Sequence, residues 1–188
     1  GDVKHPVTGE VLSPSPLFGQ AAVANDTDPR EALAEWMTSA ENDYFAKVQV
    51  NRVWAQLMGR GIVDPVDDLR STNPPSNPAL LDALATHFQR SGYNQKDLIK
   101  TIVLSNVYSL SSEPNASNAG DRLNYSRHYR HRQRAEVLAD AVADVTDTSD
   151  SFSALAQASR ANQVWTHRID SLFLDPFGRP DEHKDQPC

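Results

Sequence analysis

Residues 51–70 read NRVWAQLMGRGIVDPVDDLR, and this stretch decides how the rest of the chain is arranged. Its first half is the end of a predicted helix that begins at Asn42 or Asp43 and runs to Met58. Gly59 follows, and glycine readily takes the left-handed conformation that closes a helix. The second half is a turn rich in charged residues. The stretch therefore predicts a long helix followed directly by a charged loop.

The predicted helix over residues 43–58 is apolar on most of its sides. At about 100° per residue, four polar positions fall on one strip that is about 80° wide. These positions are Gln49, Arg52, Gln56 and, just beyond the helix, Arg60. A helix with so much apolar surface belongs at the centre of a fold. We therefore predict an all-α, multihelical bundle around this central apolar helix, with Trp36 and Trp54 in the core.

Capping residues and apolar periodicity predict the remaining elements. Asp28 and Asn77 each precede a proline at the first position of a helix, which starts helices at residues 29 and 78. We expect these helices to end near residues 40 and 92 and a fourth to run over 95–108. A fifth is expected to follow residue 134, and the residues on its apolar face are Val137, Leu138, Ala141, Val142 and Val145. Another short helix is expected near 152–161.

The domain organisation follows from these elements. We predict a single helical domain over residues 1–188, with an extended arm at 1–28, a helical core at 29–147 and a loop-rich wrapping tail at 148–188. The chain begins with glycine, so we expect it to be a module excised from a larger protein, with further domains upstream.

Charge and cysteine content exclude several kinds of partner. The net charge of -7 and the pI near 5.3 argue against nucleic acid as a partner, because binding to phosphates needs a basic surface. No apolar run approaches the ~18 residues of a membrane span, so we expect no membrane insertion. Cys188 is the only cysteine. It cannot form a disulfide within the chain, and a cysteine-based metal site or haem attachment is excluded.

The charged loop after the central helix is the first candidate site. It contains Asp64, Asp67 and Asp68, with Arg60 and Arg70 close in sequence. These carboxylates could act as the acid and base in the hydrolysis of a glycan, or they could bind a hard cation such as calcium. The loop does not, however, have the residue spacing of an EF-hand. Alternatively they could form a structural network with Arg52, Arg60 and Arg70, since nearby arginines lower the pKa of a carboxyl group. The network is the favoured interpretation, and we predict no metal.

Arg52 is the second candidate, because it lies on the polar strip of an otherwise apolar helix. A buried arginine requires a carboxylate partner. We predict Glu136, near the start of the fifth helix, as that partner. The pair would fix the packing of two helices, and a catalytic role for it is the less favoured alternative.

A basic segment over residues 127–134 is the third candidate. Arginines recur in it together with Tyr129 and two histidines. On an acidic protein, such a segment could hold a sulfate, phosphate or uronic acid group through its guanidinium groups, with tyrosine stacking on a sugar face. Alternatively, the carboxylates of residues 64–68 could neutralise it. The arginines concerned are Arg127, Arg130, Arg132 and Arg134.

Four motifs in order resemble one known family. They are residues 51–70, NPPSNP at 73–78, RAEVL at 134–138 and FGRP at 177–180. The chain is similar to a domain-of-unknown-function family that is common in planctomycetes, where it forms the C-terminal module of large exported proteins that often carry cytochrome-c-type haem modules. The resemblance implies an exported protein, with haem on upstream modules and no cofactor in this chain. Family members often have cysteines after the last motif, where this chain has only Cys188.

Two classes of function follow from these features. The first is a structural or binding module associated with haem-bearing or carbohydrate-active partner domains, with an anionic glycan as a possible ligand. The second is part of a hydrolytic or redox enzyme on glycans, with a site shared with upstream domains. The first is favoured, because the chain offers no complete catalytic constellation. A pocket lined by both the acidic loop and the basic segment would favour the enzyme, and an apolar docking surface would favour the module.

Overall fold

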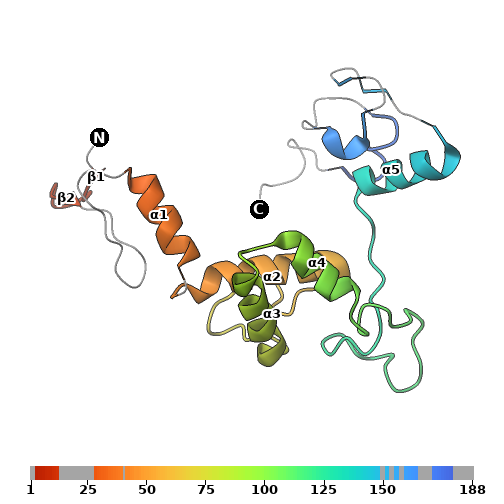
Figure 1. The fold of residues 1–188 in the computed structure, drawn as a ribbon, viewed down its shortest axis with the longest axis horizontal. Coiled ribbons are helices and arrows are strands. Elements are labelled where there is room, and N and C mark those ends of the chain that lie inside the picture. The colour runs from red at the N-terminus through yellow and green to blue at the C-terminus, as the bar shows by residue number, and fades with distance from the viewer. Residues whose placement is uncertain are drawn as a thin grey trace. The chain divides into compact units, whose positions relative to one another are not determined.

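The computed structural model describes residues 3–12, 28–39, 41–148, 151–152, 155–156, 159–164 and 171–179. The described chain is mostly helical, which confirms the all-α prediction (Figure 1). Contacts divide it into two compact units, residues 1–130 and residues 131–188, and each is described separately. The prediction of a single domain stays a prediction. The elements are β1 (Val3–Lys4), β2 (Val11–Leu12), α1 (Pro29–Thr38), α2 (Asp43–Met58), α3 (Pro78–Arg90), α4 (Gln95–Val103), α5 (Ala135–Thr146) and the 3-10 helix η1 (Ala161–Gln163).

The helix starts follow the capping residues. The side-chain oxygens of Asp28, Asn42 and Asn77 accept hydrogen bonds from the first turns of α1, α2 and α3. Each bond satisfies a backbone N–H that the helix itself leaves without a partner. Gly59 closes α2 with a φ of 78°. These starts, and the end of α2, confirm the predictions.

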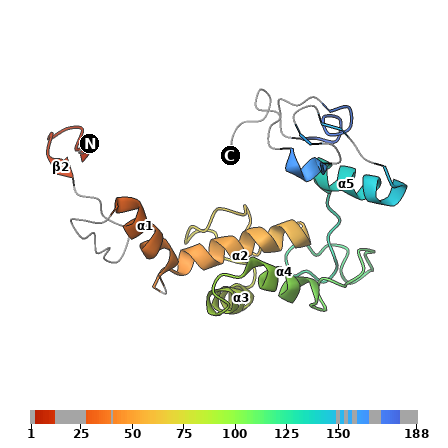
Figure 2. The ribbon, with the colours of Figure 1, turned by 45° about the horizontal axis from the view of Figure 1, so that its top comes forward.

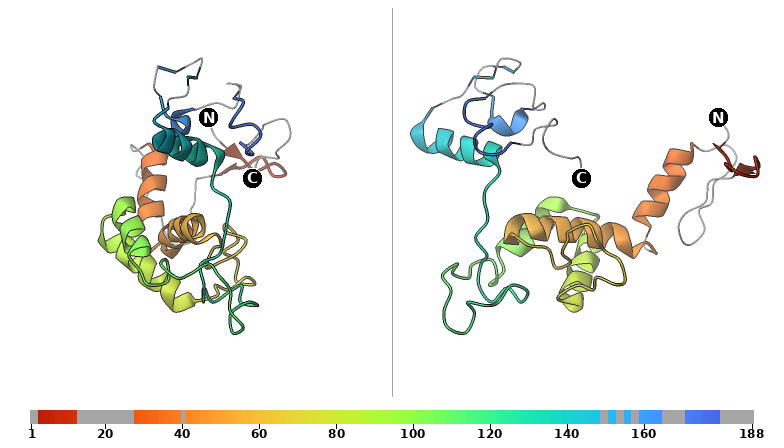
Figure 3. Two further views of the ribbon diagram at one scale, coloured as in Figure 1. Left: turned by 90° about the vertical axis from the view of Figure 1, so that its right-hand side faces the viewer. Right: turned by 180° about the vertical axis from the view of Figure 1, so that it is seen from behind.

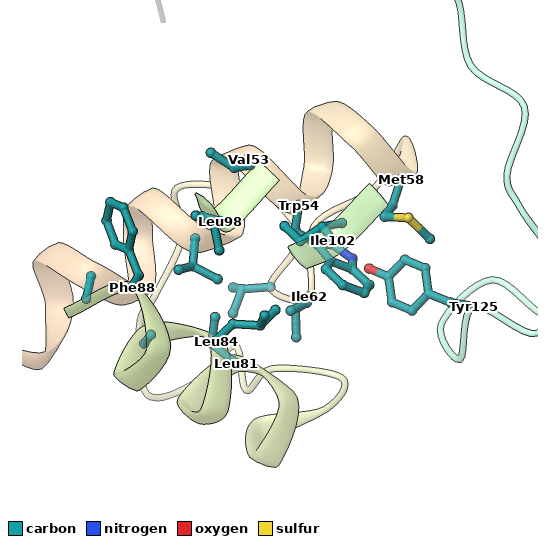
Figure 4. Packing of buried hydrophobic residues seen from close by; sticks show 14 residues of the cluster. Val53, Trp54, Met58, Ile62, Leu81, Leu84, Phe88, Leu98, Ile102 and Tyr125 are labelled. Carbon is teal, nitrogen blue, oxygen red and sulfur yellow. The ribbon is translucent and has the colours of Figure 1, made fainter. Parts of the chain in front are cut away.

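The core of the first unit is built on α2. Helices α3 and α4 lie against it and against each other, as Figures 1 and 2 show, and α1 meets the start of α2 (Figure 3). Apolar side chains from α2, α3, α4 and the loop after α2 fill the space between them (Figure 4). The largest fully buried apolar side chains there are Val50, Met58, Ile62, Val63, Phe88, Leu98 and Ile102. Trp54 is also buried, as predicted, whereas Trp36 is only half-buried.

Two details of the first unit differ from the predictions. Helix α4 ends at Val103, five residues short of the predicted end at 108. Beyond it, the hydroxyl and the N–H of Ser105 both bond the carbonyl of Ile102, which favours a turn over another helical turn. The N-terminal arm, which was predicted to be extended, contains two strands, β1 and β2, which pair antiparallel with Val3 opposite Leu12. Residues 13–27 of the arm lie outside the described ranges.

The second unit is organised by α5 and η1. Asp140 of α5 accepts a hydrogen bond of 2.6 Å from the backbone N–H of Ala161, and Arg160 forms a two-pronged ion pair with Asp144. The buried face of α5 is Ala135, Ala139 and Asp140.

The predicted apolar face of α5 was therefore wrong. Of the predicted face, Leu138 is half-buried, and Val137, Ala141, Val142 and Val145 are exposed, with Val145 86% accessible. Small alanine side chains let η1 approach closely, and the carboxylate of Asp140 satisfies backbone N–H groups there, so this face packs instead of the valine face. The helix expected near 152–161 is not present in the described residues of that range, of which only Ala161 is helical.

Candidate functional site

The charged loop after α2 is held in place by Asn51. The Asn51 side chain is fully buried, accepts a hydrogen bond from the N–H of Val63 (2.9 Å) and donates to the carbonyls of Val63 (2.9 Å) and Val66 (2.7 Å). The peptide bond between Asp64 and Pro65 is cis. One buried amide therefore fixes the loop that carries the predicted acidic residues.

Tyr125 joins a distant segment to the same loop. Its hydroxyl donates to the carbonyls of Gly61 (2.7 Å) and Arg60 (3.1 Å). Its ring packs edge-on to Trp54 at 5.2 Å between centroids, and the indole nitrogen faces the hydroxyl (Figure 4). The backbone of Tyr125 is left-handed, with a φ of 52°, which is unusual for a residue with a side chain. Residues 121–130 are thereby brought to the end of α2.

We expect the buried Tyr125 hydroxyl to make the stability of the protein depend on pH in the alkaline range. Burial raises the pKa of Tyr125 from 10.0 to about 12, and contact with Trp54 offsets part of the rise. The unfolded chain loses the Tyr125 hydroxyl proton near pH 10, and the folded chain loses it only near pH 12. The contribution of this hydroxyl to the free energy of unfolding is therefore complete below pH 10 and is lost between pH 10 and about 12. Tyr125→Phe should cost ~1 kcal/mol at neutral pH, because two carbonyls lose a donor.

Urea unfolding at about pH 8 and about pH 11 tests this expectation. The stability difference between the native protein and Tyr125→Phe should shrink at the higher pH. An unchanged difference would show that the hydroxyl is not held protonated by the fold.

The segment that Tyr125 anchors is shaped by Asp121. The carboxylate of Asp121 accepts hydrogen bonds from the N–H groups of Leu123 (3.0 Å), Asn124 (2.9 Å) and Ser126 (2.9 Å), and from the Ser126 hydroxyl. Together these donors hold the pKa of Asp121 well below its usual range, with the Ser126 hydroxyl the largest cause. Asp121 is therefore ionised near neutral pH, where it holds the loop through these hydrogen bonds and cannot act as an acid.

A pocket of about 560 Å³ lies elsewhere in the first unit, and one of about 530 Å³ lies where this segment meets the end of α2. The second pocket unites part of the acidic loop with part of the basic segment, although they are far apart in sequence. Its lining residues are Gly59, Arg60, Asp64, Ser112, Pro114, Asp121, Arg122, Arg127, Tyr129 and Arg130. We call it the arginine pocket.

Four arginines line the arginine pocket, against the carboxylates of Asp64 and Asp121 in its lining and of Glu113 beside it. Arg60 pairs with Asp64 at 3.1 Å, and Arg130 pairs with Glu113. The guanidinium carbon of Arg127 lies 5.2 Å from the ring centre of Tyr129, and its buried Nε has no hydrogen-bond partner. Within the described chain, neither Arg127 nor Arg122 has a carboxylate partner. These two guanidinium groups therefore remain available for an anion from outside the chain.

The other residues of the acidic loop form ion pairs, as the favoured interpretation of the sequence predicted. Asp67 bonds Arg52 at 2.7 Å, and Asp68 bonds Arg70 at 2.6 Å. The hydrogen bond from the arginine lowers the pKa of each of these two carboxyl groups. None of these four residues is among those that line the arginine pocket.

Two predicted pairings are corrected by these contacts. Arg52 is 53% exposed and pairs with Asp67, so it is not the buried arginine that would need Glu136. The loop that follows Gly59 brings Asp67 to Arg52 of α2, which sequence spacing does not reveal. Arg130 is neutralised by Glu113, from the loop after α4, and not by residues 64–68.

Three predicted residues lie in the second unit. Arg132 and Arg134 are exposed, Arg134 directly precedes α5 without capping it through its side chain, and Glu136 is half-buried in the first turn. The structure thus gathers Arg60, Asp64, Arg127, Tyr129 and Arg130 at one pocket and leaves the other candidates outside it.

Sequence reasoning missed several residues of the site. Asp121, Arg122, Ser112 and Pro114 line the pocket, and the Asn51 amide holds the loop beside it. Of these residues, only Asp121 could have been identified from the sequence, because an aspartate at the start of a turn commonly accepts hydrogen bonds from the backbone N–H groups that follow it. Across the described ranges, no three His, Cys, Asp or Glu residues are grouped to hold a metal ion. No described helix is both long and apolar enough to cross a membrane.

The fold and the pocket define a mostly helical protein with an arginine-lined pocket. Residues 29–186 match the family described as Protein of unknown function (DUF1553), PSD1, and the chain belongs to this family. The family resemblance stated above is thereby confirmed as far as a domain of unknown function. No curated protein and no solved structure matches the chain.

Proposed function

We propose that this chain is a binding module that holds an anionic glycan in the arginine pocket. The observation that carries the proposal is the presence of two guanidinium groups, Arg122 and Arg127, without carboxylate partners in a pocket of about 530 Å³. This volume falls within the range of ~300–1,000 Å³ typical of small-molecule sites. The whole chain has a net charge of -7, so a cationic pocket on it is a local feature.

The chemistry of the pocket suits a sugar carboxylate or sulfate. A guanidinium group presents paired N–H donors whose geometry matches the oxygens of a planar or tetrahedral anion. Stacking on Tyr129 restricts the orientation of the Arg127 guanidinium, which reduces the entropy lost when an anion binds. The Ser112 hydroxyl adds a polar group for the uncharged parts of the ligand. We infer an acidic oligosaccharide as the ligand class.

The alternative, part of a glycan-active enzyme, has less support. The pocket does unite Asp64 with the basic segment, which is the arrangement that would favour an enzyme. A glycosidase, however, needs one carboxyl group that is protonated near neutral pH. Asp121 is held ionised by its loop, and Asp64 is paired with Arg60. Binding without catalysis therefore accounts better for these contacts.

The cellular setting is also a proposal. The motifs shared with exported, multidomain planctomycete proteins support an exported protein in which this module works beside upstream domains, some of them haem-bearing or carbohydrate-active. In that setting the module would bring its partner domains to an acidic glycan. Fractionation of cells that produce the native protein, with an antibody against this chain, would test the location.

We expect the chain to bind an oligogalacturonate or a sulfated oligosaccharide, and not a neutral oligosaccharide of the same length. Arg122→Gln/Arg127→Gln should weaken binding at least about tenfold, because each charged hydrogen bond contributes ~1.5–3 kcal/mol. Isothermal titration at low and moderate salt measures the affinities, and added salt should weaken them.

Arg90→Gln/Lys100→Gln is the matched control for this experiment. It removes the same charge from exposed positions outside the pocket. Equal losses in the two double variants would mean that net charge, and not the pocket, attracts the glycan. Absence of binding by the native chain to every acidic oligosaccharide would overturn the proposal.

A further inference from the structure

The stretch of chain that carries Glu113 forms part of the wall of the arginine pocket. Ser112 and Pro114, its neighbours in sequence, both line the pocket, whereas Glu113 itself is not among the lining residues. Two hydrogen bonds fix the backbone there, from the N–H of His128 to the carbonyl of Ser111 (3.1 Å) and from the N–H of Glu113 to the Ser111 hydroxyl (3.1 Å). Glu113 is therefore held beside the pocket.

Glu113 neutralises one of the arginines that line the pocket. Its carboxylate bonds Nη2 of Arg130, and Nε of Arg130 donates to the Ser112 hydroxyl (3.2 Å). The side chains of Arg130 and Glu113 are 66% and 74% exposed. An ion pair in such an exposed position contributes little free energy, because water screens both charges. The Glu113 carboxylate can therefore leave at low cost, while the bond to Ser112 keeps the guanidinium group at the pocket.

The other carboxylates of the pocket are less easily displaced. Asp64 and Arg60 form their ion pair within the lining itself, and their side chains are only 37% and 33% exposed. The carboxylate of Asp121 is occupied by backbone N–H groups of its own loop. Of these three carboxylates, that of Glu113 is the one that an anion from outside replaces most readily.

The acidic group of a glycan offers Arg130 the same chemistry as the Glu113 side chain. A uronic acid is itself a carboxylate, and a sulfate presents the same kind of charged oxygen to a guanidinium group. Exchange breaks one charge-assisted hydrogen bond and forms another, and the released Glu113 carboxylate returns to water. A neutral sugar hydroxyl forms a weaker bond with a guanidinium group than a carboxylate does, so it does not displace Glu113.

We propose that Glu113 is a built-in competitor for the anion site, which an acidic group of the ligand displaces from Arg130. This role rests on the proposed function of the arginine pocket and deepens it in two ways. Arg130 becomes a third guanidinium group that contacts the ligand, beside Arg122 and Arg127. Glu113 becomes a residue that sets specificity, because only a ligand that is itself anionic takes its place.

Glu113→Gln tests this role, because glutamine keeps the size of the side chain and removes its charge. The full chain would be titrated calorimetrically with an oligogalacturonate and, separately, with inorganic sulfate. Glu113→Gln should bind each anion about two- to fivefold more tightly than the native chain, which is the range that corresponds to an exposed ion pair. Glu35→Gln is the matched control, because it removes the same charge from an exposed position on α1 outside the pocket, and it should leave both affinities unchanged.

Arg130→Gln shows whether Glu113 acts through this arginine. In the Arg130→Gln background, Glu113→Gln should bring no gain in affinity, because the carboxylate then has no guanidinium group to block. Melting temperatures without ligand should match that of the native chain, which shows that each variant is folded. Weaker or unchanged binding by Glu113→Gln, an equal gain in Glu35→Gln, or a gain that persists without Arg130 would overturn the role of Glu113.

The two anions separate this role from the proposed function. Tighter binding of sulfate by Glu113→Gln, with no oligosaccharide bound by either chain, would confirm the competition and exclude the glycan as the ligand. Binding of the oligosaccharide by the native chain, with no gain in Glu113→Gln for either anion, would support the glycan and exclude the competition. No binding of either anion by either chain would overturn both.

Discussion

Replacing Asn51 with alanine is expected to destabilise the protein by about 3–5 kcal/mol. The fully buried amide makes three hydrogen bonds to the backbone of the following loop. Alanine would leave the N–H of Val63 and the carbonyls of Val63 and Val66 without these partners. Each buried backbone group that loses its partner costs ~1–3 kcal/mol. Urea unfolding followed by circular dichroism measures the loss.

Two further variants separate the hydrogen bonds from the helix itself. Gln56→Ala removes an exposed amide from the same helix and should change stability by less than about 0.5 kcal/mol. Asn51→Asp keeps the size of the side chain and its acceptor but replaces the donor with a carboxylate oxygen that faces two carbonyls. It should therefore be as harmful as alanine. A mild effect of Asn51→Asp would show that the donated bonds contribute little to the loop.

The helices were predictable because their signals are local. Asp28, Asn42 and Asn77 cap the turns that directly follow them, and Gly59 closes the helix that directly precedes it. The end of α4 and the buried face of α5 were not predictable in this way. Ser105 can continue a helix or end it, and the choice depends on its bond to Ile102. On α5 the apolar pattern identified a valine face, whereas packing used Ala135, Ala139 and a carboxylate.

The site was only partly predictable, because its residues meet through long-range contacts. The sequence singled out Arg60, Asp64 and the segment from Arg127 to Arg130 as charged, and the arginine pocket unites them. It could not show that Tyr125 bonds the carbonyl of Gly61, 64 residues earlier. That contact sets which side of the 121–130 segment meets α2. The partner of Arg130 was missed for the same reason, since Glu113 belongs to a loop with no pattern of its own.

Gly61→Ala is expected to destabilise the protein by about 2–4 kcal/mol, because the loop leaves no space for a side chain. A Cβ atom at this position would lie 2.2 Å from the carbonyl oxygen of Val63 and 3.0 Å from the amide nitrogen of Asn51. The backbone of residues 61–63 would have to move, and the bonds of Asn51 and Tyr125 would lengthen with it. Gly120→Ala is the control, because nothing lies within 4 Å of its Cβ position.

The variants at Gly61 and Asn51 should also be coupled, because both act on the same loop. Once Asn51→Ala has released the loop, the carbonyl of Val63 can move away from a new Cβ atom at residue 61. Gly61→Ala should therefore cost less in the Asn51→Ala background than in the native protein, by ~0.5–3 kcal/mol in a double-mutant cycle of unfolding free energies. Additive costs would mean that the two residues act on separate parts of the structure. In that case Asn51 would not be what holds Asp64 and the carbonyl of Gly61 at the edge of the arginine pocket.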